Sequence, residues 1–191
     1  MRPCIQIMDA KHSFSIKTPK DLLLKLEREK ARFIEASSFD NKEHKFQYDH
    51  AINFAYTAWH MVDWIWKYLE GKNLDVRGIT GCSKFQEFHS MVREGCFGLQ
   101  ICYEIATGSK HFQADRIKNP VVKGTEEEIY ETDGVTSPIV KPIVRPVVRP
   151  VVKKHHAEIR VHIEGRGSLR FTEVCEEVHL YWRKFLQAAA F

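Results

Sequence analysis

The sequence predicts a mainly α-helical fold: a bundle of four to five helices with a small antiparallel β-hairpin and an extended Pro-Val-Val-basic repeat segment. Three observations predict it. Apolar residues recur at helical spacing through residues 18–112, strict alternation begins at Ala157, and helix-start residues precede a last amphipathic segment near Thr172. Because 191 residues with 43% hydrophobic and 28% charged side chains suffice for one buried core, a single domain over 1–191 is expected.

The first helix is expected to begin at Thr18. Threonine is a favoured N-cap, Pro19 suits the first helical position, and Asp21 places an acid in the first turn. Ser37 and Ser38 end the segment. The residues expected to face the core are Leu22, Leu23, Leu26, Phe33 and Ile34.

The second helix is predicted from about His44 to Glu70, with Gly71 as its C-cap. Apolar residues cover most of its circumference, so it should lie in the middle of the bundle. Its polar residues form one stripe within an arc of about 140° at 100° per residue. The stripe consists of His50, Asn53, Thr57, His60, Asp63 and Lys67. We interpret it as the solvent-facing side; the alternative is a site that lines a cleft.

Two shorter helices should follow. Residues 72–81 are interpreted as a loop, and Ser83 can cap a helix that stops at Gly95. A further helix runs from Cys96 to Gly108. The short joint between the two helices favours antiparallel packing.

The region 113–156 has a different character, with an acidic tract and an internal repeat. The tract 126–133 carries five acids and is interpreted as a loop or mobile segment. Four Pro-x-x-basic units begin at Pro138, Pro142, Pro146 and Pro150. Residues four apart share one strand edge, so the prolines block that edge only. We therefore expect an extended strand that pairs along its other edge with the 157–163 strand or with another chain; a disordered arm and a nucleic-acid-binding arm are the alternatives.

The basic residues of the repeat are candidate nucleic-acid contacts, because they carry positive charge without an acid among them. They are Lys141, Arg145, Arg149, Lys153 and Lys154. The acids of residues 126–133 would compete for them within the molecule. A net charge of +4 is too small to identify a nucleic-acid-binding protein by itself.

The last part of the chain, 157–191, predicts a hairpin and a closing helix. Residues 157–163 alternate between apolar and polar, 164–167 form a turn, and Leu169 and Phe171 suit a returning strand. Thr172 can cap the closing helix. The side chains expected to be most buried are Phe54, Trp59, Ile65, Trp182 and Phe185.

Several classes of protein are disfavoured by what the sequence lacks. The five cysteines are odd in number and irregularly spaced, and the N-terminus has no signal-peptide pattern, so reduced thiols and a cytoplasmic location are expected. The apolar window 51–69 contains Asp63 and Lys67, which favours a buried helix over a membrane span. No paired-cysteine, HExxH, phosphate-loop or nucleophile-elbow motif occurs, so no metal and no cofactor are expected.

Two segments resemble a known family. The run from Tyr56 to Trp64, followed by the run from Glu104 to Phe112, resembles the HEPN-type helical bundles over roughly residues 18–112. Ribonucleases of that superfamily carry an R-x₄₋₆-H motif, with the arginine and histidine meeting across a dimer interface. His111 stands at the position of the histidine, whereas residues 104–106 read Glu-Ile-Ala and the nearest upstream arginine is Arg93.

This resemblance implies a non-catalytic, HEPN-like binding module that engages a protein partner or RNA, as an oligomer, in bacterial defence or a toxin–antitoxin system. One alternative is a metal-independent ribonuclease in which His111 accepts the proton, helped by His60 or Lys110. The other is a structural subunit that assembles through the 138–153 strand.

Overall fold

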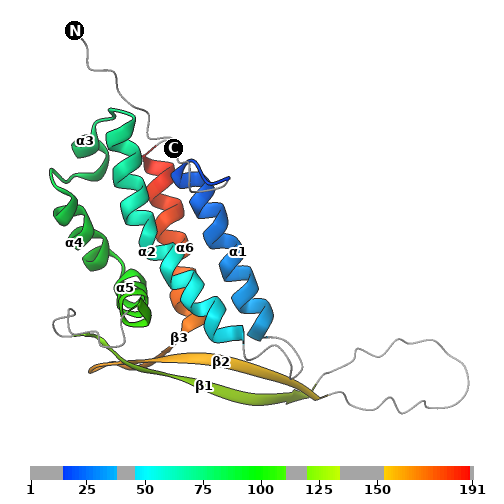
Figure 1. The fold of residues 1–191 in the computed structure, drawn as a ribbon. Coiled ribbons are helices and arrows are strands. Elements are labelled where there is room, and N and C mark those ends of the chain that lie inside the picture. Colours follow the sequence, from blue (N-terminus) through cyan, green and yellow to red (C-terminus); the bar gives the residue numbers. More distant parts are fainter. Residues whose placement is uncertain (1–14, 38–45, 111–119, 134–152, 190–191) are drawn as a thin grey trace, which may run out of the picture.

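The computed structural model describes residues 15–37, 46–110, 120–133 and 153–189. It confirms the predicted fold class, a mainly helical bundle with a small antiparallel sheet at one end (Figure 1). The elements are α1 (Pro19–Ser37), α2 (Gln47–Gly71), α3 (Val76–Thr80), α4 (Phe85–Gly95), α5 (Phe97–Lys110), β1 (Val122–Asp133), β2 (Lys153–Ile163), β3 (Gly167–Arg170) and α6 (Phe171–Ala188). Within these ranges no helix combines the length and the apolar character that crossing a membrane requires.

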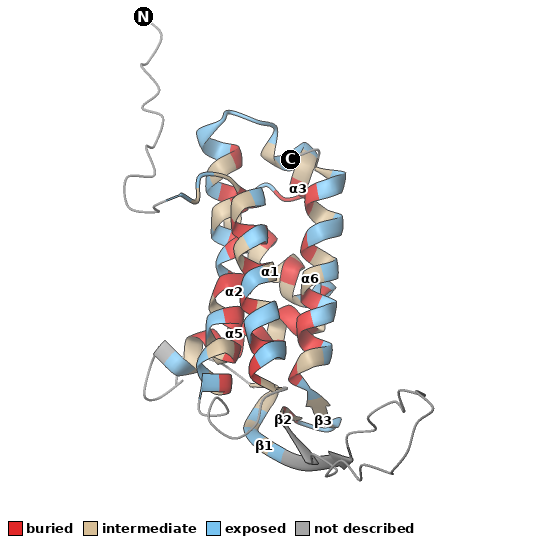
Figure 2. Cartoon of the chain, turned by 90° about the vertical axis from the view of Figure 1, so that its right-hand side faces the viewer, coloured by how far each residue is buried: buried red, intermediate tan, exposed pale blue. Residues whose placement is uncertain are grey.

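Helix α2 lies at the centre of the bundle, as its apolar circumference predicted. It packs against α1, α4, α5 and α6, and the α1, α2 and α6 ribbons run side by side (Figures 1 and 2). Figure 1 looks almost along the axis of α5, whereas α4 lies across the view. The two helices are therefore not antiparallel, and the expectation of antiparallel packing is wrong. Only the extended residue Cys96 separates them, and a reversal of chain direction between helices needs about 2–5 residues.

The start of α1 confirms the expected capping. The backbone N–H of Asp21 donates to Thr18 Oγ1 at 3.1 Å, and the Thr18 N–H donates to the Asp21 carboxylate at 2.9 Å. The inward face is as predicted except at Ile34, which is 40% exposed. Phe33 and Ala36 lie on the buried stripe, and Ile34 is turned about 100° from Phe33 along the helix.

The end of α2 differs from the expectation that Gly71 is the C-cap. Gly71 is the last helical residue, and Asn73 adopts the left-handed conformation with φ of 52°. Residues 72–81 also contain the single turn α3, which the sequence reading missed. Its N-cap Asp75 accepts the backbone N–H of Gly78 at 2.9 Å, and Gly81 ends the turn with φ of 75°.

The predicted core residues are confirmed in four of five positions. Phe54, Trp59, Ile65 and Trp182 are buried, whereas Phe185 is only partly buried. The buried positions gather where the helices face one another, and the outer faces are exposed (Figure 2).

Aromatic residues of α6 close the core. Trp182 is fully buried, and its indole Nε1–H donates to the carbonyl oxygen of Ala58 at 3.0 Å. Phe171 packs edge-to-face against Phe33 and Phe54, with ring centroids 5.2 Å and 6.0 Å away. Helix α6 begins at Phe171 with Arg170 as its N-cap, so the expectation that Thr172 caps this helix is wrong.

The acidic tract 126–133 is not a loop, as expected, but part of the strand β1. It pairs antiparallel with β2 along residues 153–163, and β3 completes the order β1-β2-β3. Three consecutive glutamates hide the alternation that would identify a strand. Opposite charges pair across the two strands, where Glu128 lies 2.5 Å from Arg160, and at the turn after β2, where Glu164 lies 2.7 Å from Lys123 of β1.

The β2–β3 hairpin is confirmed, with Gly165 and Gly167 at positive φ in its turn. The strand expected to receive the repeat is instead paired with β1 along its length. The repeat itself, from Pro138 to Val152, lies outside the described residues.

Candidate binding groove between α2 and α4

The structure describes only part of the catalytic set named from the sequence. His60 is exposed on α2, with its ring 5.9 Å from that of Tyr56. Lys110 is the last residue of α5, where only the backbone is described, and His111 lies outside the described residues. Nothing in the described part therefore brings these three side chains together.

The predicted nucleic-acid contacts are likewise mostly out of view. Lys141, Arg145 and Arg149 lie outside the described residues. Lys153 and Lys154 begin β2, where the backbone alone is described, and the register places them opposite Asp133 and Thr132. The acidic strand therefore shares a sheet with this basic segment.

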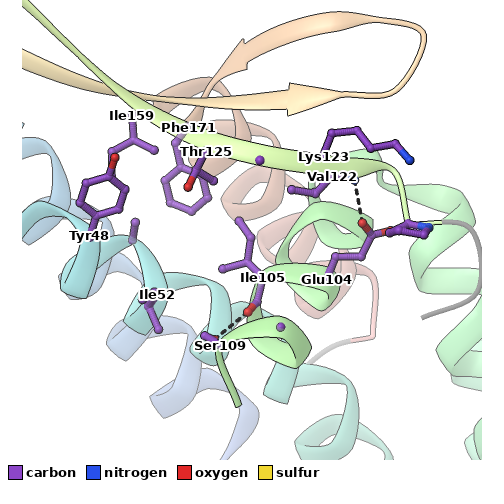
Figure 3. A pocket seen from close by; sticks show the side chains of 14 residues that line it. Tyr48, Ile52, Glu104, Ile105, Ser109, Val122, Lys123, Thr125, Ile159 and Phe171 are labelled. Carbon is purple, nitrogen blue, oxygen red and sulfur yellow. Dashed lines mark hydrogen bonds between the residues drawn. The ribbon is translucent and has the colours of Figure 1, made fainter. Parts of the chain in front are cut away.

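Glu104 is one of the three positions, 104–106, at which the resemblance would require an arginine, and it has a structural role. Its side chain is 4% exposed, and its carboxylate accepts the backbone N–H groups of Val121 at 3.1 Å and Val122 at 2.8 Å. The Gln100 side chain donates to the same carboxylate. Through these hydrogen bonds Glu104 links the start of β1 to α5 (Figure 3).

A cavity of about 400 Å³ lies between the bundle and the sheet, beside Glu104 (Figure 3). Its walls are mainly apolar and include Ile52, Ile105, Ile159 and Phe171. Its size falls within the range of small-molecule sites. Its polar wall groups are partly engaged already, since the Ser109 hydroxyl donates to the carbonyl oxygen of Ile105.

The polar stripe of α2 divides between two roles. Asn53 and His60 are exposed to solvent, as interpreted from the sequence, but Thr57 is buried and accepts a hydrogen bond from the Lys25 ammonium. Asp63 and Lys67 are exposed and also line a depression of about 450 Å³ that α2 shares with α4. The remaining residues that line this α2/α4 groove are Trp66, Glu70, Ser83, Lys84, Phe85 and Gln86.

Hydrogen bonds hold the α2 side of the groove in place. Glu70 accepts from Lys67 at 3.1 Å and from the Trp66 indole N–H at 2.8 Å. The bond from Lys67, followed by that from Trp66, lowers the pKa of Glu70, so it is ionised at neutral pH. The Trp66 ring packs against Phe85 of α4, with centroids 5.9 Å apart.

An aromatic cluster lies next to the groove along α4 and contacts it through Phe85. His89 lies one turn after Phe85, and its ring is 4.5 Å from Trp59 and 5.5 Å from Tyr103. The Arg93 guanidinium, one turn further, lies 4.9 Å above the Tyr103 ring. Neither His89 nor Arg93 is predicted from the sequence as part of a site. The spacing of positions 85, 89 and 93 does place all three on one helix face.

Burial lowers the pKa of His89. The positive charge of Arg93 acts in the same direction, and the negative charge of Asp63 opposes it. His89 is therefore a neutral imidazole at pH 7, able to accept one hydrogen bond and donate another. Protonation of this ring is disfavoured by the fold.

The stability of the protein should fall as the pH drops below about 6.5, the ordinary histidine pKa. As the pH falls through this value, His89 takes up a proton in the unfolded chain but stays neutral in the folded protein. The free energy of unfolding therefore decreases until the pH reaches the lowered pKa of His89 in the folded state. Urea unfolding midpoints between pH 7.5 and pH 5 should show a smaller loss for His89→Gln than for the wild type. Equal losses would contradict the role given to this ring.

Cysteine chemistry is disfavoured in the described part of the chain. Burial raises the pKa of Cys82, of Cys96 to about 12, and of Cys102 and Cys175 well above the usual value. Because the thiolate is the nucleophile, these four thiols are unreactive at neutral pH. Among the residues whose placement is described, no three His, Cys, Asp or Glu side chains are grouped to hold a metal ion.

Comparison with protein-family models, with curated proteins and with solved structures finds no match to this chain.

Proposed function

We propose that the chain is a non-catalytic, HEPN-like binding module whose α2/α4 groove binds a segment of a protein partner. The observation that carries this proposal is the composition of the groove. Its floor contains Trp66 and Phe85, and its rim carries charges of both signs. Aromatic residues at the centre of a polar rim are typical of protein–protein contacts.

The charges of the groove favour a protein segment over RNA. Asp63 and Glu70 balance Lys67 and Lys84, so the lining residues have no net charge. RNA binding draws most of its affinity from neutralising many phosphates, which requires a surplus of basic side chains. A mixed polypeptide segment can satisfy both signs at once.

The sheet gives similar support. Arg160 pairs with Glu128 at 2.5 Å, and His162 Nε2 lies 3.1 Å from Glu126. The contact with Glu128 compensates the positive charge of Arg160 within the molecule, which leaves this side chain less available to a polyanion.

A photo-crosslinking residue placed at Gln86 tests the proposal. Gln86 is exposed and lines the groove, so crosslinking in cells that express the protein should yield a discrete protein adduct. The matched control is the same crosslinker at Leu180, which is 50% exposed on α6 and does not line the groove. The adduct partner is then identified by mass spectrometry and purified.

Binding of that purified partner, measured by calorimetry, should be weakened about tenfold or more by Phe85→Ala if Phe85 is a buried anchor. A partner that crosslinks from Leu180 and not from Gln86 would contradict the groove. Recovery of RNA at Gln86 would favour the nucleic-acid alternative instead.

A further inference from the structure

Arg93 is a cation that has no carboxylate partner among the residues that the structure describes. Its guanidinium packs on the Tyr103 ring, and its Nε atom is buried with no hydrogen-bond partner. Among the described side chains no carboxylate lies within ion-pair distance of it. Buried donors in native proteins are nearly always paired, so an unpaired guanidinium N–H requires an explanation.

The environment of Arg93 favours its charge without giving Nε an acceptor. Arg93 lies in the last turn of α4, where the helix dipole attracts cations. The guanidinium carbon of Arg93 lies 4.9 Å from the centroid of the Tyr103 ring, which is a cation–π contact. The ring contact supplies no hydrogen-bond acceptor, so the Nε–H group still lacks one among the described residues.

His89 supplies a second polar group on the same helix face. It lies one turn before Arg93, and its ring contacts the rings of Trp59 and Tyr103, which also contact each other. As a neutral imidazole it can donate one N–H beside the guanidinium. Phe85, one turn earlier, has its ring 6.0 Å from His89 and also lines the α2/α4 groove.

We propose that Arg93 and His89 form an oxyanion site at the end of the α2/α4 groove, which receives the carboxylate of an Asp or Glu side chain from the protein partner. This inference rests on the proposed function, since it names the chemistry by which the same partner is recognised. Arginine presents a fork of donors that matches a carboxylate with two parallel hydrogen bonds. The approach of the carboxylate would give the buried Nε–H group of Arg93, or its neighbours on the fork, the acceptor that the described residues lack.

The test uses the isolated protein and small anions, so it needs no partner. Sodium acetate is titrated at fixed ionic strength against chloride, and NMR follows the Arg93 Nε–H resonance and the His89 ring. We expect saturable shifts of both signals and a rise in the pKa of His89, because a bound anion stabilises the imidazolium. Absence of saturable shifts would overturn the proposal.

Two variants of Arg93 establish where the anion binds. Arg93→Gln should weaken acetate binding about tenfold or more, because it removes a charged hydrogen-bond donor. Arg93→Lys keeps the charge but loses the fork, and it should weaken binding less. The control Arg77→Gln changes an exposed arginine of α3 and should leave the titration unchanged. If Arg93→Gln binds acetate as the wild type does, the site is elsewhere and the proposal is wrong.

A parallel titration with inorganic phosphate separates the two sources of oxyanion. Binding of acetate with comparable or weaker binding of phosphate supports a carboxylate ligand. Binding of phosphate alone would overturn the carboxylate assignment. Failure of the Gln86 crosslink together with saturable acetate binding would refute the groove as a protein site while leaving the anion site in place, so the two proposals fail separately.

Discussion

Replacing Trp182 by alanine should destabilise the protein by about 3–5 kcal/mol. The indole is fully buried at the meeting point of α2 and α6, so its removal leaves a cavity that the surrounding helices can only partly fill. The change also removes the hydrogen bond to the carbonyl oxygen of Ala58. Chemical denaturation, followed by far-UV circular dichroism, measures the loss.

Two further variants separate packing from hydrogen bonding. Trp182→Phe keeps a ring in the core but loses the indole N–H, so it should cost about 1–2 kcal/mol. Leu180→Ala changes an exposed residue on the same helix and should stay within about 0.5 kcal/mol of the wild type. A Trp182→Ala variant as stable as Leu180→Ala would show that the packing of α6 described above is wrong.

Replacing Glu104 by alanine should cost about 2–3 kcal/mol, because two backbone N–H groups lose a charged acceptor. Glutamine keeps one acceptor oxygen, so Glu104→Gln should cost less than alanine. The effect should be local. Hydrogen exchange at the amides of Val121 and Val122 should accelerate in both variants, more strongly in Glu104→Ala.

The control for this pair is Glu94→Ala, an exposed acid of α4. It removes the same charge without touching β1, so exchange at Val121 and Val122 should not change. Equal exchange at these amides in the wild type and in Glu104→Ala would mean that Glu104 does not hold the strand. In that case Glu104 would also not fix the position of the cavity wall that it forms.

How far the sequence predicts this fold depends on how local the signal is. Thr18 and Asp21 predict the start of α1 correctly, because the capping hydrogen bonds join residues only three positions apart. The strand β1 cannot be recognised from its local sequence. The partners of its acids are Arg160 and His162, which lie more than thirty residues later in the chain. A local pattern cannot show a pairing that is made only in three dimensions.

The candidate site shows the same limit. His60 attracts attention in the sequence because it interrupts an apolar helix, yet it lies exposed beside Tyr56. His89 and Arg93 belong to an ordinary amphipathic pattern on α4, and their meaning arises from Trp59 and Tyr103 on two other helices. Helical spacing could have placed 85, 89 and 93 on one face, but not the rings opposite them.

The position of α6 in the bundle has a consequence for biosynthesis. This helix contacts α1 and α2, yet it follows them in the chain and is synthesised about one hundred residues later. The apolar faces of α1 and α2 that await Phe171 and Trp182 therefore stay uncovered until translation has passed residue 182. During that interval the exposed apolar surface makes the nascent chain prone to aggregation.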